Sequence, residues 1–139
     1  MKKAALDIGD QWTGIALTDS SAIIARPYHT VATSELIPYL TQLLSLEAID
    51  AIIIGYPKTM SGTHSEQTTK LLAMADVLKE QFPTMNWHLI DERLSSKRAA
   101  SQAKGISKEE KLRSHAIAAA FILDSYLTYM RMHTPENID

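Results

Sequence analysis

Hydrophobic positions at the start of the chain come in short runs separated by polar turns. Apolar runs at 3–9 and 14–18, and a third extended segment near 23–31, predict three consecutive strands. Their short links favour an antiparallel meander. Pro27 cannot donate a backbone hydrogen bond, so it places part of the third strand at a sheet edge.

The middle of the chain alternates between helical and extended patterns. Leucines spaced by three and four residues follow Ser34, a candidate N-cap, and predict a helix. The apolar run at 51–54 predicts a strand that is covered on both faces. A capping box at 63–66 begins a second helix, Pro83 ends it, and residues 85–90 predict another strand.

The last third of the chain is predicted to be helical. A short helix is expected from 95–96 to Gly105, and a second capping box at 107–110 begins a long helix. The tail from about residue 133 is expected to fray. This order of elements predicts an α/β fold in a single domain over 1–139. Its mixed sheet combines a three-strand antiparallel meander with two parallel strands, and helices cover both faces.

Composition narrows the class of protein. The 139 residues include no cysteine, which excludes disulfide scaffolds, thiolate zinc sites and cysteine nucleophiles. Asp7 interrupts the first apolar run after three residues, whereas a signal peptide needs about 7–15. No apolar run approaches the roughly 20 residues that span a bilayer. We therefore expect a soluble, cytoplasmic protein with no membrane contact.

Positive charge is concentrated in one segment although the whole chain has a formal net charge of −2. Residues 93–113 contain seven basic and two acidic side chains, a local net charge of +5. Such a cluster is typical of a protein that contacts a phosphate backbone. Two solvated helix faces would give the same pattern, and the charge alone does not decide between them.

Acidic residues occur where apolar strands are expected. A carboxylate such as Asp7 is costly in apolar surroundings unless it is paired, hydrogen-bonded or bound to a metal. Asp91 and Glu92 end another apolar strand, and neighbouring strand ends can converge on one crevice. Carboxylates gathered there would repel one another, and Mg²⁺ relieves that repulsion with oxygen ligands. The pattern fits metal-assisted phosphodiester hydrolysis.

Each carboxylate also has a purely structural interpretation. Asp7 can cap the turn that follows it, and Asp91 can bond to Arg93 or to backbone amides. Glu92 can pair with Lys97 on the surface. A shared metal site replaces three separate explanations by one.

His115 falls on the apolar stripe of the predicted long helix, among small alanines. A neutral imidazole there can ligate a metal or accept a proton from water. A histidine satisfied within the core is the alternative interpretation.

Four segments together resemble a known family, in order from residue 4 to about 127: ALDIGDQWTGIALTD, IIIGYPKTMSGTHSEQ, HLIDERLSS and SHAIAAAFILDSYL. They are similar to the YqgF family, also called RuvX, whose members have a ribonuclease H-like fold. The resemblance implies a nuclease that depends on Mg²⁺ or Mn²⁺. The implied substrate is structured RNA. The resemblance implies that the protein processes the 5′ end of precursor 16S ribosomal RNA during ribosome biogenesis. Branched DNA, cut as by a Holliday junction resolvase, is the alternative.

The resemblance also implies roles for individual residues. Asp7 would be the first metal ligand, and Glu92 is preferred to Asp91 for the next, because strand-end hydrogen bonds can occupy Asp91. His115 would complete the site, but it stands where the family usually has an aspartate. Related nuclease folds accept histidine there. A non-catalytic RNA-binding module, in which His115 marks a decayed site, is the third hypothesis.

Contacts to nucleic acid are expected around that site. The family often has Lys-Arg in the first turn, where this chain has Gln11 and Trp12; the tryptophan either stacks on a base or packs in the hairpin. A loop from Gly55 to Thr63 precedes a helix N-terminus and either binds phosphate or is simply a tight turn. The candidate contact residues are Lys58, Thr59, Arg93, Lys97, Arg98 and Trp12. The protein is expected to be a monomer or a homodimer.

Overall fold

The computed structural model of the chain describes residues 1–56, 66–91 and 107–133. Its elements, in chain order, are β1 (Lys2–Ile8), β2 (Trp12–Thr18), β3 (Ala25–Ala32), a 3₁₀ turn (Thr33–Glu35), α1 (Leu36–Leu46), β4 (Ile49–Tyr56), α2 (Glu66–Gln81), β5 (Asn86–Asp91) and α4 (Lys108–His133). The short helix expected up to Gly105 and the tail beyond 133 lie outside the described residues.

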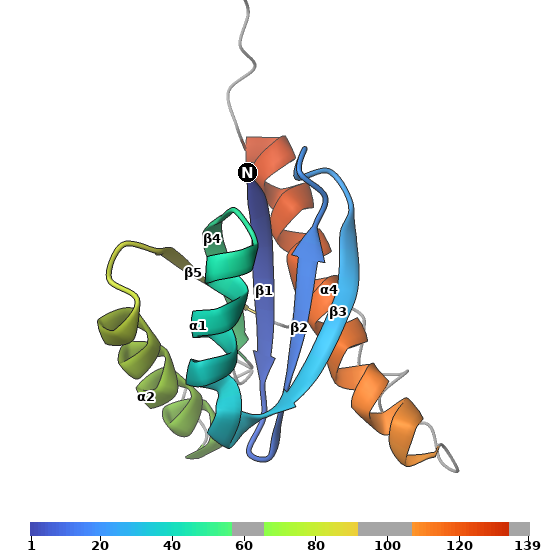
Figure 1. Cartoon of the computed structure of the whole chain (residues 1–139). Coiled ribbons are helices and arrows are strands. Elements are labelled where there is room, and N and C mark those ends of the chain that lie inside the picture. The colour runs from blue at the N-terminus through green and yellow to red at the C-terminus, as the bar shows by residue number, and fades with distance from the viewer. Residues whose placement is uncertain (57–65, 92–106, 134–139) are drawn as a thin grey trace, which may run out of the picture.

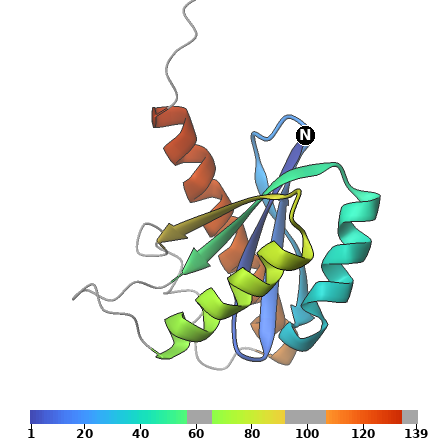
Figure 2. The same cartoon turned by 90° about the vertical axis from the view of Figure 1, so that its left-hand side faces the viewer.

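Five strands form one mixed sheet in the order β3-β2-β1-β4-β5. The pairs β1–β2 and β2–β3 are antiparallel, while β1–β4 and β4–β5 are parallel. Figures 1 and 2 show α1 and α2 on one face of this sheet and α4 on the other. The predicted meander, the two parallel strands and the helices on both faces are therefore confirmed.

Large side chains fill the layer between the sheet and the helices α1 and α2. Leu6 on β1 and Ile52 and Ile54 on β4 point into this layer, and all three are fully buried. Leu36 and Leu40 of α1 are likewise fully buried there. Alternation along β4 turns Ile53 to the opposite face, so this strand is covered on both sides, as its apolar run predicts.

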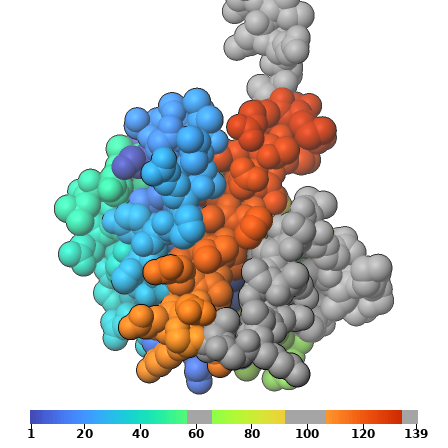
Figure 3. Space-filling model, turned by 90° about the vertical axis from the view of Figure 1, so that its right-hand side faces the viewer, coloured from blue at the N-terminus to red at the C-terminus, as the bar shows by residue number. Residues whose placement is uncertain are grey.

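Small side chains line the layer between the sheet and α4. Ala5, Ala16 and Ala119 are completely buried there, beside the larger Ile122 and Leu123. Small residues let a helix backbone approach a sheet closely, because there is little side-chain volume between them. Figure 3 shows α4 running across this face of the molecule.

Two element boundaries differ from the sequence-based expectation. Strand β3 begins at Ala25, because the Asp19 carboxylate accepts hydrogen bonds from the amides of Ile23 (2.9 Å) and Ile24 (3.0 Å) and so closes the turn. These amides, with the Ser21 hydroxyl, hold the pKa of Asp19 well below its usual range, the Ile24 amide contributing most. Helix α1 is capped by Glu35 without a side-chain bond, so Ser34 is not its N-cap.

The long helix begins as predicted. The Ser107 hydroxyl accepts a hydrogen bond from the Glu110 amide at 3.2 Å, as an N-cap does. No helix in the described part of the chain is long and apolar enough to cross a bilayer.

Candidate active site

Asp7 lies near the carboxyl end of β1 and is half-buried. Its cross-strand partner is Gly14 of β2. Side chains alternate along a strand, so Asp7 is on the same face as Ala5, which packs in the α4 layer. The carboxylate that interrupts the apolar pattern of β1 therefore faces α4.

Gly14 is where α4 comes closest to the sheet. A Cβ atom added at Gly14 would lie 1.8 Å from the His115 carbonyl oxygen and 2.7 Å from the Ala116 nitrogen. No side chain fits there, so the backbone of α4 lies directly on that of β2. This contact places His115 of α4 over the strand that pairs with Asp7.

A second contact holds the same part of α4 from the next strand. Thr30 of β3 is the cross-strand partner of Gly14, and its hydroxyl donates a hydrogen bond of 2.5 Å to the Leu112 carbonyl oxygen. Asp7, Gly14 and Thr30 thus form a row across three strands. Two members of the row fix the helix that carries His115, and the third, Asp7, supplies a carboxylate on the sheet face that this helix covers.

Asp91 is the last residue of β5. It lies at the carboxyl end of the parallel strands, as Asp7 does, and pairs with Tyr56 of β4. In β5 the ring of His88 contacts that of Tyr126 on α4, with centroids 5.4 Å apart. Alternation then turns Asp91, three positions later, toward α2. Asp7 and Asp91 therefore lie at the same end of their parallel strands, but on opposite faces of the sheet.

None of Asp7, Asp91 and His115 is without an interaction partner in the chain. Among the described residues, no group of three or more carboxylates and histidines is arranged to hold a metal ion. The third expected ligand, Glu92, lies outside the described residues. A half-buried carboxylate and an imidazole on one face are nevertheless ligand types that suit a divalent cation.

Trp12 begins β2 and is half-buried. Gly14 and Ala16, which alternate with it, face α4, so Trp12 is on the same face as Asp7. The expected contact residues Lys58, Thr59, Arg93, Lys97 and Arg98 lie outside the described residues.

Part of the basic segment is described at the start of α4. Lys108, Lys111 and Arg113 are exposed there, with Glu109 and Glu110 exposed beside them. Arg113 also lines an open groove of about 520 Å³ between α4 and the edge strand β3. These described charges sum to only +1, so most of the predicted excess falls on 93–106.

Sequence reasoning missed Gly14 and Thr30. A glycine inside a strand is a usable signal, because it marks a bulge or a close backbone approach. Thr30 offers no comparable signal, since threonine is common in strands and its bond to Leu112 joins residues far apart in sequence.

Comparison with known proteins supports the same fold. RuvC of Thermus thermophilus in complex with a Holliday junction aligns with a TM-score of 0.61 at 16% identity, covering 96% of this chain and 98% of that one. A second structure of Thermus thermophilus RuvC aligns with a TM-score of 0.59 at 19% identity, with the same coverage. At these identities the likeness establishes the ribonuclease H-like fold.

Relatives in sequence cover most of the chain. A Rubrobacter xylanophilus protein is 34% identical over 125 residues, which are 89% of this chain and 90% of that protein. A Desulfitobacterium hafniense protein is 34% identical over 99% of both chains. Both are named "Putative pre-16S rRNA nuclease". The family model described as RuvX, Holliday junction resolvase, matches residues 1–129, and the chain therefore belongs to the RuvX family.

Proposed function

We propose that this protein is a divalent-metal-dependent nuclease that hydrolyses phosphodiester bonds in precursor 16S ribosomal RNA. One observation carries the proposal: the half-buried Asp7 faces α4 in the row where Gly14 seats the backbone of His115. The reaction class, nuclease, and the RNA substrate are inferred from the names of the family and of its relatives.

Three residues would hold the metal: Asp7, His115 and Glu92. The preference for Glu92 over Asp91 is supported by the alternation of β5, which turns Asp91 toward α2. Asp91 is then assigned to supporting the strand end. A Mg²⁺ or Mn²⁺ ion held there would stabilise negative charge on the phosphate and lower the pKa of water toward neutral pH.

Other residues would bind and orient the nucleic acid. Trp12, on the Asp7 face, is assigned to stacking on an unpaired base, which contributes about 1–3 kcal/mol per base. Backbone phosphates are assigned to the basic and hydroxyl side chains of Lys58, Thr59, Arg93, Lys97 and Arg98. Phosphate contacts fix the register of the strand.

The test is cleavage of a transcript that contains the 5′ end of precursor 16S ribosomal RNA, with the purified chain and Mn²⁺. Asp7→Asn keeps the shape of the side chain but removes its charge, and we expect cleavage to fall at least a hundredfold. The matched control is Asp76→Asn, an exposed carboxylate on α2, which should cut like the wild type. Wild-type cleavage no faster than that of Asp7→Asn would refute the proposal.

Branched DNA is the second candidate substrate, because the matching family model is described as a Holliday junction resolvase. Resolution of a junction needs two active sites on opposite strands, and hence a dimer. Competition between a four-way junction and the precursor RNA at one stated salt concentration separates the two substrates. Preference for the junction, together with a dimer in sedimentation, would favour DNA.

The third possibility, RNA binding without catalysis, depends on His115. Calorimetric titration with Mn²⁺ distinguishes this possibility from a metal-dependent nuclease, because a decayed site takes up no metal. If the histidine only weakens a working site, His115→Asp should raise both metal affinity and cleavage rate. RNA binding with no Mn²⁺ uptake would instead support the binding module.

A further inference from the structure

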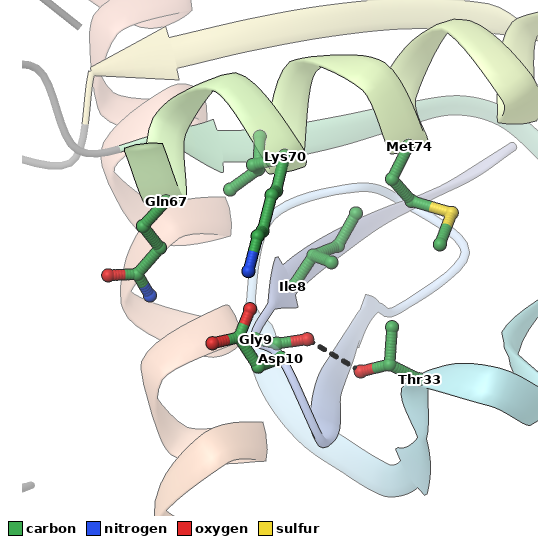
Figure 4. A pocket seen from close by; sticks show the side chains of 8 residues that line it. Ile8, Gly9, Asp10, Thr33, Gln67, Lys70 and Met74 are labelled. Carbon is green, nitrogen blue, oxygen red and sulfur yellow. Dashed lines mark hydrogen bonds between the residues drawn. The ribbon is translucent and has the colours of Figure 1, made fainter. Parts of the chain in front are cut away.

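A small notch lies on the opposite face of the sheet from Asp7, at the same end of β1, and its lining combines polar side chains with the apolar Ile8, Leu71 and Met74. It is formed by the β1–β2 turn on one side and the first turns of α2 on the other, with a volume of about 150 Å³. That is about five water volumes. Figure 4 shows Asp10 of the turn and Lys70 and Gln67 of α2 around it. A volume of this order matches a single small polar group, such as one phosphate with its sugar, rather than a whole base pair.

The turn that carries Asp10 is held rigidly. The Gly9 amide donates to the Trp12 carbonyl at 2.9 Å, and the Thr33 hydroxyl donates to the Gly9 carbonyl at 2.7 Å. The Thr33 amide also donates to the Gln11 carbonyl at 2.9 Å. A Cβ atom at Gly9 would lie 2.8 Å from the Trp12 oxygen, so the turn requires glycine. Binding at this turn needs little further ordering of its backbone.

Three polar side chains on the two walls of the notch have no partner among the described residues. The side chains of Asp10, Gln67 and Lys70 make no hydrogen bond or ion pair there. Lys2 and Lys3, by contrast, each contact a carboxylate within 3 Å. Figure 4 shows the Lys70 ammonium directed toward the turn that carries Asp10. The notch thus presents an amine side chain on one wall and a carboxyl side chain on the other.

We propose that the notch binds one ribose–phosphate unit of the bound RNA strand. This rests on the proposed function. The Lys70 ammonium contacts the phosphate, and the Asp10 carboxylate accepts a hydrogen bond from the ribose 2′-hydroxyl. DNA lacks that hydroxyl and leaves the carboxylate without a donor. The notch therefore selects RNA over DNA without reading the sequence of bases.

Binding can be measured apart from cleavage by using the full chain in EDTA. Fluorescence anisotropy with a labelled single-stranded RNA and the DNA of the same sequence gives both affinities at several salt concentrations. The wild type should bind RNA about tenfold more tightly, the effect of one hydrogen bond to a charged group. Asp10→Ala should bring the ratio close to one, whatever its effect on overall affinity.

Lys70→Gln should weaken RNA and DNA binding by the same factor and reduce the salt slope by about one. The matched control is Lys79→Gln, an exposed lysine in the last turn of α2, which should retain the wild-type slope. A thermal melt of each variant confirms that it is folded. Both substitutions are at exposed positions, so the fold should tolerate them.

Two results would overturn the assignment. An RNA-to-DNA ratio unchanged in Asp10→Ala refutes the ribose contact, and a salt slope in Lys70→Gln equal to that in Lys79→Gln refutes the phosphate contact. If the wild type cuts RNA yet both results occur, the notch proposal fails and the nuclease proposal stands. If both binding predictions hold but Mn²⁺ supports no cleavage, the notch proposal stands and the nuclease proposal fails.

Discussion

The two faces of the sheet are packed in different ways. Toward α1 and α2, fully buried leucines and isoleucines fill the layer, and nearly all of its buried members are large apolar residues. Toward α4, the sheet presents Ala5, Gly14 and Ala16, and the helix backbone lies against the strand at Gly14. The first face stabilises mainly through buried apolar volume. The second uses close approach to position His115, so the effects of substitutions on stability and on activity should separate between the faces.

The largest expected change in stability is on the leucine-rich face. Leu40→Ala removes a completely buried side chain and leaves a cavity, which should lower the free energy of unfolding by about 2–5 kcal/mol. Because α4 and Asp7 lie on the other side of the sheet, the rate per folded molecule should stay near the wild-type value. Urea unfolding and cleavage assays well below the midpoint measure the two quantities. A large loss of cleavage rate in Leu40→Ala molecules that are fully folded would contradict the proposed difference between the two faces.

Gly14→Ala should show the opposite pattern. The new methyl group would overlap the His115 carbonyl, so α4 must move away, at about 1–3 kcal/mol for overpacking. The expected loss of cleavage and of Mn²⁺ affinity exceeds that of Leu40→Ala, despite the smaller loss of stability. The control is Ala48→Gly, a small change outside both layers. Metal affinity equal to the wild type would show that the close approach does not position the site.

Thr30→Val sharpens the comparison within the α4 face. It removes the hydroxyl that bonds to the Leu112 carbonyl and keeps the side-chain shape, so stability should fall by about 0.5–1.5 kcal/mol. The effect on metal affinity should be smaller than in Gly14→Ala, because the backbone contact remains. Thr41→Val, which removes a hydroxyl bond to Ile37 within α1, is the matched control. Equal losses of metal affinity in Thr30→Val and Thr41→Val would exclude a positioning role for Thr30.

The smallest expected change in stability comes from an ion pair that lies in neither of the two packed layers. Lys3 and Asp50 pair at 2.7 Å between β1 and β4, and the hydrogen bond from Lys3 holds the pKa of Asp50 below its usual range. Since the folded state lowers this pKa, the stabilisation is present above the usual carboxyl range and is lost as pH falls through the folded pKa. Asp50→Asn should cost about 0.2–1 kcal/mol at pH 7 and less in acid. Urea unfolding at pH 7 and in acid measures the difference in free energy of unfolding between the wild type and Asp50→Asn. A difference that is larger in acid than at pH 7 would contradict this assignment.

Much of the fold could be predicted because local patterns and topology rules agree. The apolar runs of β1, β2 and β4, the leucine spacing of α1 and the Ser107 cap each indicate one element. Short links then leave few arrangements of the first three strands. The boundary at Ser34 was wrong because Thr33 is bonded to the β1–β2 turn, a contact between distant residues.

The candidate site was only partly accessible from sequence. Asp7 stood out because a carboxylate inside an apolar strand needs an explanation, and its place on the α4 face could then be reasoned from the sheet register. The contact between Gly14 and His115 is a matter of tertiary packing, which no spacing rule reveals. The difference in face between Asp7 and Asp91 likewise depends on pairing through β4.

The row formed by Asp7, Gly14 and Thr30 joins the first strands to a helix near the far end of the chain. During translation, the meander leaves the ribosome long before α4 does, and contacts of such long range form late. A chain still being synthesised would therefore leave the sheet face that carries Asp7 uncovered until α4 is complete.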